Sequence, residues 1–157
     1  MADTPMHLAE KLLADGEKTL AFFELLTEEQ WRIEVYTDGM DWSVREVLCH
    51  FAVTETGFNR LLENILNGGE GSPEDFNIDV YNRKKVAQLE NASLEDLKST
   101  YNQARLKNAD LVSQLQPEDL QRTGRHPFLG VAPLEDIIKL IYRHNQIHLR
   151  DVRKLLG

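Results

Sequence analysis

The chain has 157 residues, of which 41% are hydrophobic and 28% charged, and its formal net charge is -8. These values are typical of a soluble protein with one core, so we expect residues 1–157 to form a single domain. The negative charge argues against nucleic-acid binding, and no apolar run approaches the roughly 20 residues that cross a bilayer, which argues against a membrane partner.

The first half of the chain predicts two long helices. Apolar residues recur with helical spacing from Met6 to Leu26, after Thr4–Pro5, which suits a helix start. Residues 27–40 predict a connection without regular structure. A capping box at Ser43–Glu46 then starts a second amphipathic helix, which we expect to end at Gly68–Gly69.

The second half predicts two more long helices and a short one. Residues 79–89 have a weaker helical pattern, and a capping signal at Ser93–Asp96 opens a long helix. Residues 121–132 contain too many glycines and prolines for a long helix, and we predict no strand pair there or elsewhere. Pro133 suits the first turn of a last helix that runs to about Leu156. We therefore expect an all-α fold, an antiparallel four-helix bundle with one short extra helical segment.

Two histidines in the last helix are the most informative residues. His144 and His148 stand four apart, so both imidazoles lie on one helix face, where they can bind the same metal ion. At about 100° per residue, the pair falls inside the apolar stripe and points toward the core. Buried imidazoles need partners, because an unpaired polar group costs about 1–3 kcal/mol. The stripe consists of Leu134, Ile137, Ile141, Val152 and Leu155.

His50 is the candidate third ligand. It lies at the edge of the apolar stripe of the second helix, from which it can reach the level of the pair if the two helices are neighbours. Three neutral imidazoles plus water would satisfy a divalent ion with an open position. Zinc or nickel is the ion that we favour, with iron or copper as alternatives. The competing interpretation is that the three histidines are simply packed in the helices.

Five other residues need an interpretation. Glu55 faces the core and either holds a ligand imidazole or binds another buried group. Asp151 follows His148 by three residues and could hold an imidazole, but we favour a partly exposed carboxylate paired with a nearby arginine. We expect His126 on the surface, with the mouth of the site as the alternative, and His7 in solvent. Cys49 points to the outer side of its helix, and we interpret it as structural.

Several catalytic motifs are missing. The residues between His144 and His148 include no glutamate, so the chain lacks the His-Glu-x-x-His motif of zinc proteases. The chain contains no Glu-x-x-His pair, which argues against a di-iron bundle. It also contains no phosphate-binding loop and no Gly-x-Ser-x-Gly elbow. The start of the chain shows no secretory signal, and one cysteine cannot form an internal disulfide, so we expect a cytoplasmic protein.

Two segments resemble the DinB/YfiT-like superfamily. Residues 42–50, Trp-Ser-Val-Arg-Glu-Val-Leu-Cys-His, are similar to the signature of its second helix. Residues 129–134 and 142–148 are similar to its final loop and helix, and the order and approximate spacing of the three histidines match. The resemblance implies a bundle in up-down-down-up order, a divalent metal bound by His50, His144 and His148, and often a homodimer.

The resemblance also implies a chemistry. Characterised members look like metal-dependent enzymes that act with low-molecular-weight thiols, among them bacillithiol and mycothiol S-transferases and a thiol-dependent maleylpyruvate isomerase. We therefore expect a metal-dependent enzyme that transfers a small thiol to an electrophilic substrate. A metal-dependent hydrolase and a non-catalytic, metal-stabilised binding module are the alternatives. No motif in the sequence selects the thiol or the electrophile.

Overall fold

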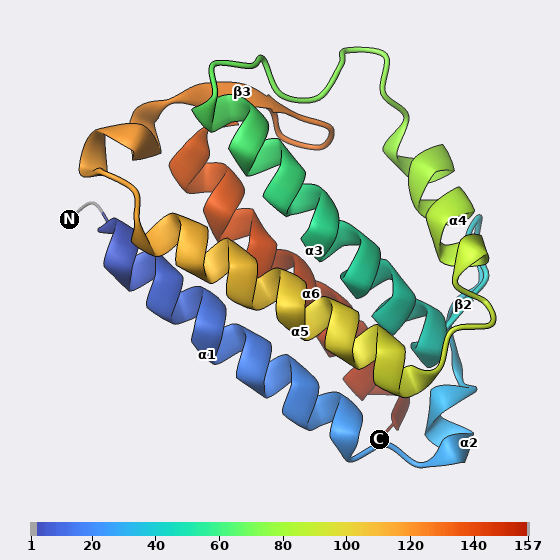
Figure 1. The fold of residues 1–157 in the computed structure, drawn as a ribbon. Helices are drawn as coiled ribbons and strands as arrows, with labels where there is room; N and C mark the ends of the chain where they lie inside the picture. The colour runs from blue at the N-terminus through green and yellow to red at the C-terminus, as the bar shows by residue number, and fades with distance from the viewer. Residues whose placement is uncertain (1–2, 157) are drawn as a thin grey trace.

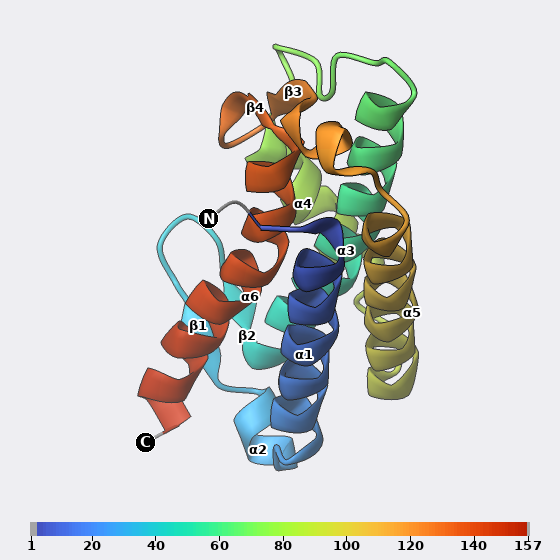
Figure 2. The same cartoon turned by 90° about the vertical axis from the view of Figure 1, so that its left-hand side faces the viewer.

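Four long helices form an antiparallel bundle in the computed structural model, which describes residues 3–156 (Figure 1). They are α1 (Pro5–Glu24), α3 (Val44–Leu66), α5 (Leu94–Ser113) and α6 (Leu134–Leu156). Both α5 and α6 pack against α1 and α3. Helices α1 and α6 run in one direction and α3 and α5 in the other, as Figures 1 and 2 show. The predicted all-α bundle and its up-down-down-up order are confirmed.

Side-chain caps fix where the helices begin. The Thr4 hydroxyl accepts a hydrogen bond from the backbone N–H of His7 at the start of α1, and Pro5 occupies the first turn. At the start of α3, the Ser43 hydroxyl accepts from the N–H of Glu46, whose carboxylate accepts from the N–H of Ser43. These bonds satisfy backbone donors that have no partner inside a helix. Both predicted starts are therefore confirmed.

The connection predicted over residues 27–40 contains regular structure. The hydroxyl of Thr27 and the amide of Gln30 form a further capping box, which starts a single helical turn. Two short strands follow, and they pair antiparallel beside α6. The sequence did not reveal them because strands of two or three residues are too short to show an alternating pattern. The elements are α2 (Glu28–Trp31), β1 (Glu34–Tyr36) and β2 (Trp42–Ser43).

A second strand pair closes one end of the bundle (Figure 2). After a 3-10 turn at Pro117–Gln121, the chain forms an antiparallel hairpin of β3 (Thr123–His126) and β4 (Gly130–Pro133). Pro133 ends β4, and α6 begins at the next residue. The expectation that no strand pair exists was therefore wrong at both connections, although residues 121–132 are indeed not a long helix.

A crossover joins the parallel helices α3 and α5. It spans residues 67–93 and contains α4 (Ile78–Gln88), which packs along α3 (Figure 1). This is the short extra helical segment that the sequence predicts. No helix within residues 3–156 is both long enough and apolar enough to cross a membrane.

The core consists of two apolar clusters separated by a polar layer. The first cluster includes Leu8, Leu12, Phe58, Leu62, Leu134, Ile137 and Ile141. The second includes Phe23, Trp31, Trp42, Phe51, Leu97, Leu149 and Val152. Leu155, expected in the stripe of α6, is 49% exposed near the helix end. We use the name polar layer for the residues that lie between the clusters along the four helices: Asp15, Thr19, Glu55, Arg105, Asn108, His144, Asn145 and His148.

The centre of the polar layer is a buried ion pair. The guanidinium of Arg105, which is 1% exposed, donates to both carboxylate oxygens of Glu55 at 2.7 and 2.9 Å. It also donates to Asp15 at 2.9 Å and to the carbonyl of Leu12 at 3.0 Å. The Asn108 amide donates to Glu55 at 2.9 Å. Because every partner comes from α1, α3 or α5, the network ties these three helices together.

We predict that Glu55→Ala strongly destabilises the protein. Removing this carboxylate leaves the buried charge of Arg105 with too few partners, which costs about 3–5 kcal/mol. The measurement is the free energy of unfolding from urea denaturation. The matched control is Glu74→Ala, which removes an exposed ion pair with Arg125 and should change the free energy by less than about 1 kcal/mol. A loss at Glu55 no larger than at Glu74 would contradict the role of the network.

Candidate metal centre

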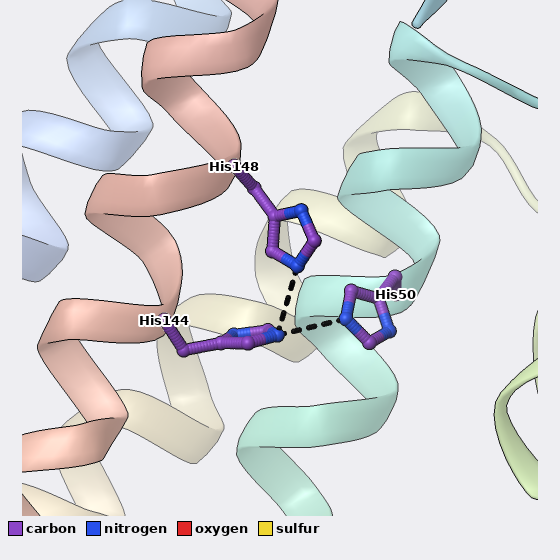
Figure 3. A group of neighbouring side chains, drawn as sticks. All are labelled: His50, His144 and His148. Atoms are coloured by element: carbon purple, nitrogen blue, oxygen red, sulfur yellow. Dashed lines mark hydrogen bonds between the residues drawn. The ribbon is translucent and has the colours of Figure 1, made fainter. Parts of the chain in front are cut away.

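Three histidine side chains from two helices converge in the bundle (Figure 3). The Nε2 atom of His144 lies 2.8 Å from Nε2 of His50 and 3.1 Å from Nε2 of His148. The three nitrogen atoms lie within 4.8 Å of one another, a spacing that allows all three to contact one metal ion. The structure thus brings together the three residues that the sequence singled out, and it places the histidine pair of α6 on the side that faces α3.

Aromatic side chains enclose the three rings. The indole of Trp42, from β2, packs on the His50 imidazole with ring centroids 4.8 Å apart. Phe51 lies 5.9 Å from both His144 and His148, measured between centroids. His50 is consequently only 4% exposed, and the other two rings are half-buried.

Burial keeps the three imidazoles neutral. It lowers the pKa of His50 well below the usual value, and the neighbouring rings of His144 and His148 lower it further. The pKa of His144 falls to about 3, mainly through burial and then through His148. Burial also lowers the pKa of His148, although Asp151 opposes this effect. Neutral imidazole is the form that binds metal ions, so the protonation state suits a metal site.

A tyrosine and an aspartate fix the orientation of His148. The Tyr36 hydroxyl donates to the Asp151 carboxylate at 2.6 Å and lies 2.7 Å from Nδ1 of His148. Burial and the bond to Asp151 raise the pKa of Tyr36, so it keeps its single proton. Since that proton goes to Asp151, the Tyr36 oxygen must accept from Nδ1–H of His148. Nε2 of His148 therefore carries a lone pair directed at the other two rings.

The donor set fits a cation. His144 Nε2 contacts two other imidazole nitrogens, but a ring nitrogen has at most one hydrogen to donate. One N–H cannot form good hydrogen bonds to two nitrogen lone pairs at once. A cation among the three nitrogens would bind the lone pair of each. The second nitrogen of His50 lies 3.3 Å from the Thr54 hydroxyl, which can hold this ring as Tyr36 holds His148.

A cavity opens onto His148. Its volume is about 330 Å³, and His148 forms part of its wall together with Tyr36 and Trp42. The rest of the wall includes charged residues of both signs, Asp38, Asp79 and Arg83. A small polar molecule in this cavity would lie against the histidine cluster.

The other predicted residues have mixed outcomes. Glu55 binds Arg105 and Asn108 and not an imidazole. Asp151 binds Tyr36, so the expected arginine partner was wrong, and its link to His148 runs through the tyrosine hydroxyl. His7, at the chain surface, lies 3.4 Å from Asp3.

The expectation about the exposure of His126 was wrong. His126 is half-buried and lines a second cavity, because the hairpin folds it over Phe58. Cys49, interpreted as structural, is fully buried, because the crossover covers the outer side of α3. Arg45 secures this cover by donating to the carbonyls of Leu89 and Ala92.

Sequence reasoning did not identify Tyr36 or Thr54 as functional residues. Tyr36 lies in a three-residue strand within the predicted connection, and it meets His148 only through the tertiary fold. Thr54 follows His50 by one helical turn, a spacing that could have indicated a contact between the two side chains.

Comparison with known proteins identifies the family. The profile of the DinB superfamily matches residues 12–152. The chain belongs to the DinB superfamily. Among curated proteins no match to this DinB protein is found.

Two solved structures share the fold of this DinB protein. One is YfiT from Bacillus subtilis, which is described as a probable metal-dependent hydrolase with an unusual four-helix bundle topology. It superposes with a TM-score of 0.66 at 19% sequence identity, and the match covers 96% of this chain and 83% of YfiT. An uncharacterised protein from Clostridium difficile 630 has a TM-score of 0.70 and 17% identity, covering 99% and 96%. At such identities the likeness establishes the fold alone.

We predict a measurable contribution of His126 to acid sensitivity. Burial lowers its pKa from the usual 6.5 to about 4 in the folded protein. The unfolded chain therefore binds more protons between these values, so this contribution to stability is complete above pH 6.5 and is lost as the pH falls toward 4. In His126→Asn, the free energy of unfolding should fall less steeply as the pH decreases, with a slope smaller by up to about 1.4 kcal/mol per pH unit. Urea denaturation between about pH 4.5 and 6, at the same ionic strength, measures both slopes. Equal slopes would contradict the pKa shift.

Proposed function

We propose that this DinB protein is a metal-dependent enzyme that transfers a low-molecular-weight thiol to an electrophilic substrate. His50, His144 and His148 would hold a divalent ion through their Nε2 atoms. The convergence of these three neutral nitrogens beside an open cavity is the observation that carries the proposal. Zinc and nickel are the ions that we favour for three imidazoles, with iron and copper as alternatives.

When bound, such an ion lowers the pKa of a coordinated thiol or water, so that the nucleophile is available at neutral pH. The protein itself supplies the orientation and the surroundings. Tyr36 and Asp151 hold His148 in the tautomer that binds a cation, and Trp42 with Phe51 limits the access of water to the rings. The polar cavity beside His148 offers room for the thiol-bearing molecule.

The lack of a carboxylate bonded to the imidazoles favours a thiol over water. Among residues 3–156, no carboxylate hydrogen-bonds directly to any of the three imidazoles, and Asp151 is engaged by Tyr36. Metal-dependent hydrolases with the His-Glu-x-x-His motif use a glutamate to take the proton of water. A free thiol has a pKa of about 8.5 and needs no such base once a cation is close.

Hydrolysis is the second candidate function. The observation that favours it is the shared fold with YfiT, which is described as a probable metal-dependent hydrolase. In this case the nucleophile would be water, and Asp38 or Asp79, which line the same cavity as His148, would accept its proton.

A homodimer and a cytoplasmic location complete the proposal. The single, buried cysteine, which can form no internal disulfide, supports a reducing compartment, and the dimer rests on the family resemblance.

Thiol transfer and hydrolysis can be distinguished with two assays on the metal-loaded protein. In the first, cysteine or glutathione reacts with 1-chloro-2,4-dinitrobenzene, so that a C–S bond forms, the C–Cl bond breaks, and chloride and a proton are released. In the second, 4-nitrophenyl acetate is hydrolysed. Transfer above the uncatalysed rate supports the first function, and ester hydrolysis without thiol supports the second. A panel of further thiols and electrophiles follows, and metal binding without turnover in any assay would favour the non-catalytic module.

We predict that the triple variant His50/His144/His148→Ala loses the metal. Elemental analysis after loading and gel filtration should give about one ion per chain for the unmodified protein and almost none for the variant. His7→Ala is the control, because it removes a histidine that lies outside the cluster. Equal metal content in the triple variant would refute the proposed ligands.

We also predict that Tyr36→Phe weakens metal binding without abolishing it. The variant keeps the ring but no longer accepts from Nδ1–H of His148, so the imidazole loses its fixed orientation. Losing such a partner typically lowers metal affinity about 10- to 100-fold. Competition with a chelator of known affinity measures the change, and Tyr81→Phe, on α4, is the matched control. An unchanged affinity would show that Tyr36 does not position the ligand.

A further inference from the structure

A second and larger cavity lies between α3 and α4. It has a volume of about 410 Å³, which falls in the range of small-molecule sites. Helices α3 and α4, the loop at residues 71–73 and the end of β3 form its wall. Aromatic and aliphatic side chains dominate, and the one charged residue of the described lining is Arg60, which is exposed. This composition favours an uncharged molecule with an apolar or aromatic body.

His126, which lines the cavity, has a hydrogen-bond donor at Nε2. Its Nδ1 accepts from the backbone N–H groups of Phe128 and Leu129, at 2.9 and 3.2 Å. A nitrogen that accepts from two N–H groups carries no hydrogen, so the hydrogen of the neutral ring lies on Nε2. The ring stacks on Phe58, with centroids 5.6 Å apart. No other side chain or backbone group of residues 3–156 hydrogen-bonds to Nε2, which leaves this donor available to a ligand.

Asn82 is a second polar side chain in the cavity wall. It comes from α4, lines the same cavity and is only 9% exposed. Within the described chain its amide makes no hydrogen bond to another residue, unlike the buried Asn108 and Asn145, whose amides donate to Glu55 and Tyr101. The polar atoms of this amide remain accessible, unlike the fully buried Asn59 Nδ2, so the amide can hydrogen-bond to a polar group on an occupant.

The cavity adjoins the proposed metal centre. Thr54 belongs to its wall, and the same hydroxyl lies 3.3 Å from Nδ1 of His50. A molecule in this cavity therefore lies one side chain away from the histidine cluster. The polar cavity beside His148 is lined by different residues. Two separate cavities at one centre suit a reaction of two substrates.

We propose that this cavity binds the electrophilic substrate, and that this substrate is an uncharged carbonyl compound with an aromatic or apolar body. The Nε2–H of His126 donates to the carbonyl oxygen, and Asn82 provides a second contact. The role as electrophile site rests on the proposed function, whereas the binding of such a molecule does not require the metal.

Two probe molecules of the same shape test the proposal. Acetophenone carries the carbonyl oxygen, and ethylbenzene lacks it. Affinities come from chemical-shift titrations of the full chain, with and without zinc. The unmodified protein should bind acetophenone about 2- to 10-fold more tightly than ethylbenzene, the contribution of one neutral hydrogen bond.

Three variants locate the site. Gly57→Leu places a side chain into the cavity from α3, where an added Cβ meets no atom within 4 Å, and it replaces a residue that disfavours helices. It should weaken both probes at least about 10-fold while folding and zinc content stay normal. His126→Asn keeps an acceptor for the hairpin N–H groups but removes Nε2–H, so it should remove the preference for acetophenone. His7→Asn is the control and should bind both probes as the unmodified protein does.

Unchanged probe binding in Gly57→Leu would overturn the site, and an unchanged preference in His126→Asn would overturn the assigned donor. The proposed function fails separately, through absent metal binding by the triple histidine variant or through absent turnover. If the protein binds the probes but shows neither metal binding nor turnover, the cavity site is supported and the enzyme proposal is refuted.

Discussion

The buried ion pair of Arg105 and Glu55 is the interaction on which the arrangement of the helices depends. Burying these charges is costly, and the cost is offset only while each keeps its partners. A shift of α3 or α5 by one turn would separate the pair, so the pair selects one register. Gly16 makes the arrangement possible, because a Cβ at this position would lie 2.9 Å from Cγ of Arg105. Apolar packing alone tolerates sliding more readily than such a network does.

The same register aligns the histidines. Asn145, which follows His144 on α6, donates to the hydroxyl of Tyr101, and the ring of Tyr101 lies 5.4 Å from the Arg105 guanidinium. The network that joins α1, α3 and α5 thus extends to α6 at the level of the three imidazoles. Apolar clusters on both sides supply the hydrophobic stabilisation, which leaves the middle of the bundle available for polar chemistry. The site reduces the apolar burial in the bundle, because three neutral imidazoles occupy positions where aliphatic side chains could have packed.

The sequence was most informative where a pattern repeats or a motif is local. Helical periodicity and the capping box at Ser43 located the long helices, and the spacing of His144 and His148 with the apolar stripe showed that both point inward. Tyr36 and Asn82 were not found, because their roles depend on contacts between segments far apart in the chain. The strand pairs were missed because they are too short for periodicity. Asp151 was assigned to an arginine, because nothing local indicated that Tyr36 would reach it first.

The up-down-down-up order has a consequence for how the chain folds. Helices α1 and α3, which follow each other, lie at opposite corners of the bundle, as do α5 and α6. The pairs that pack closely are α1 with α5 or α6, and α3 with α5 across the long crossover. No two consecutive long helices can form a stable local hairpin on which the others assemble. Every contact between two long helices must therefore close a long loop. The search for the native state is slower than in a bundle of the same size whose neighbours in sequence are neighbours in space.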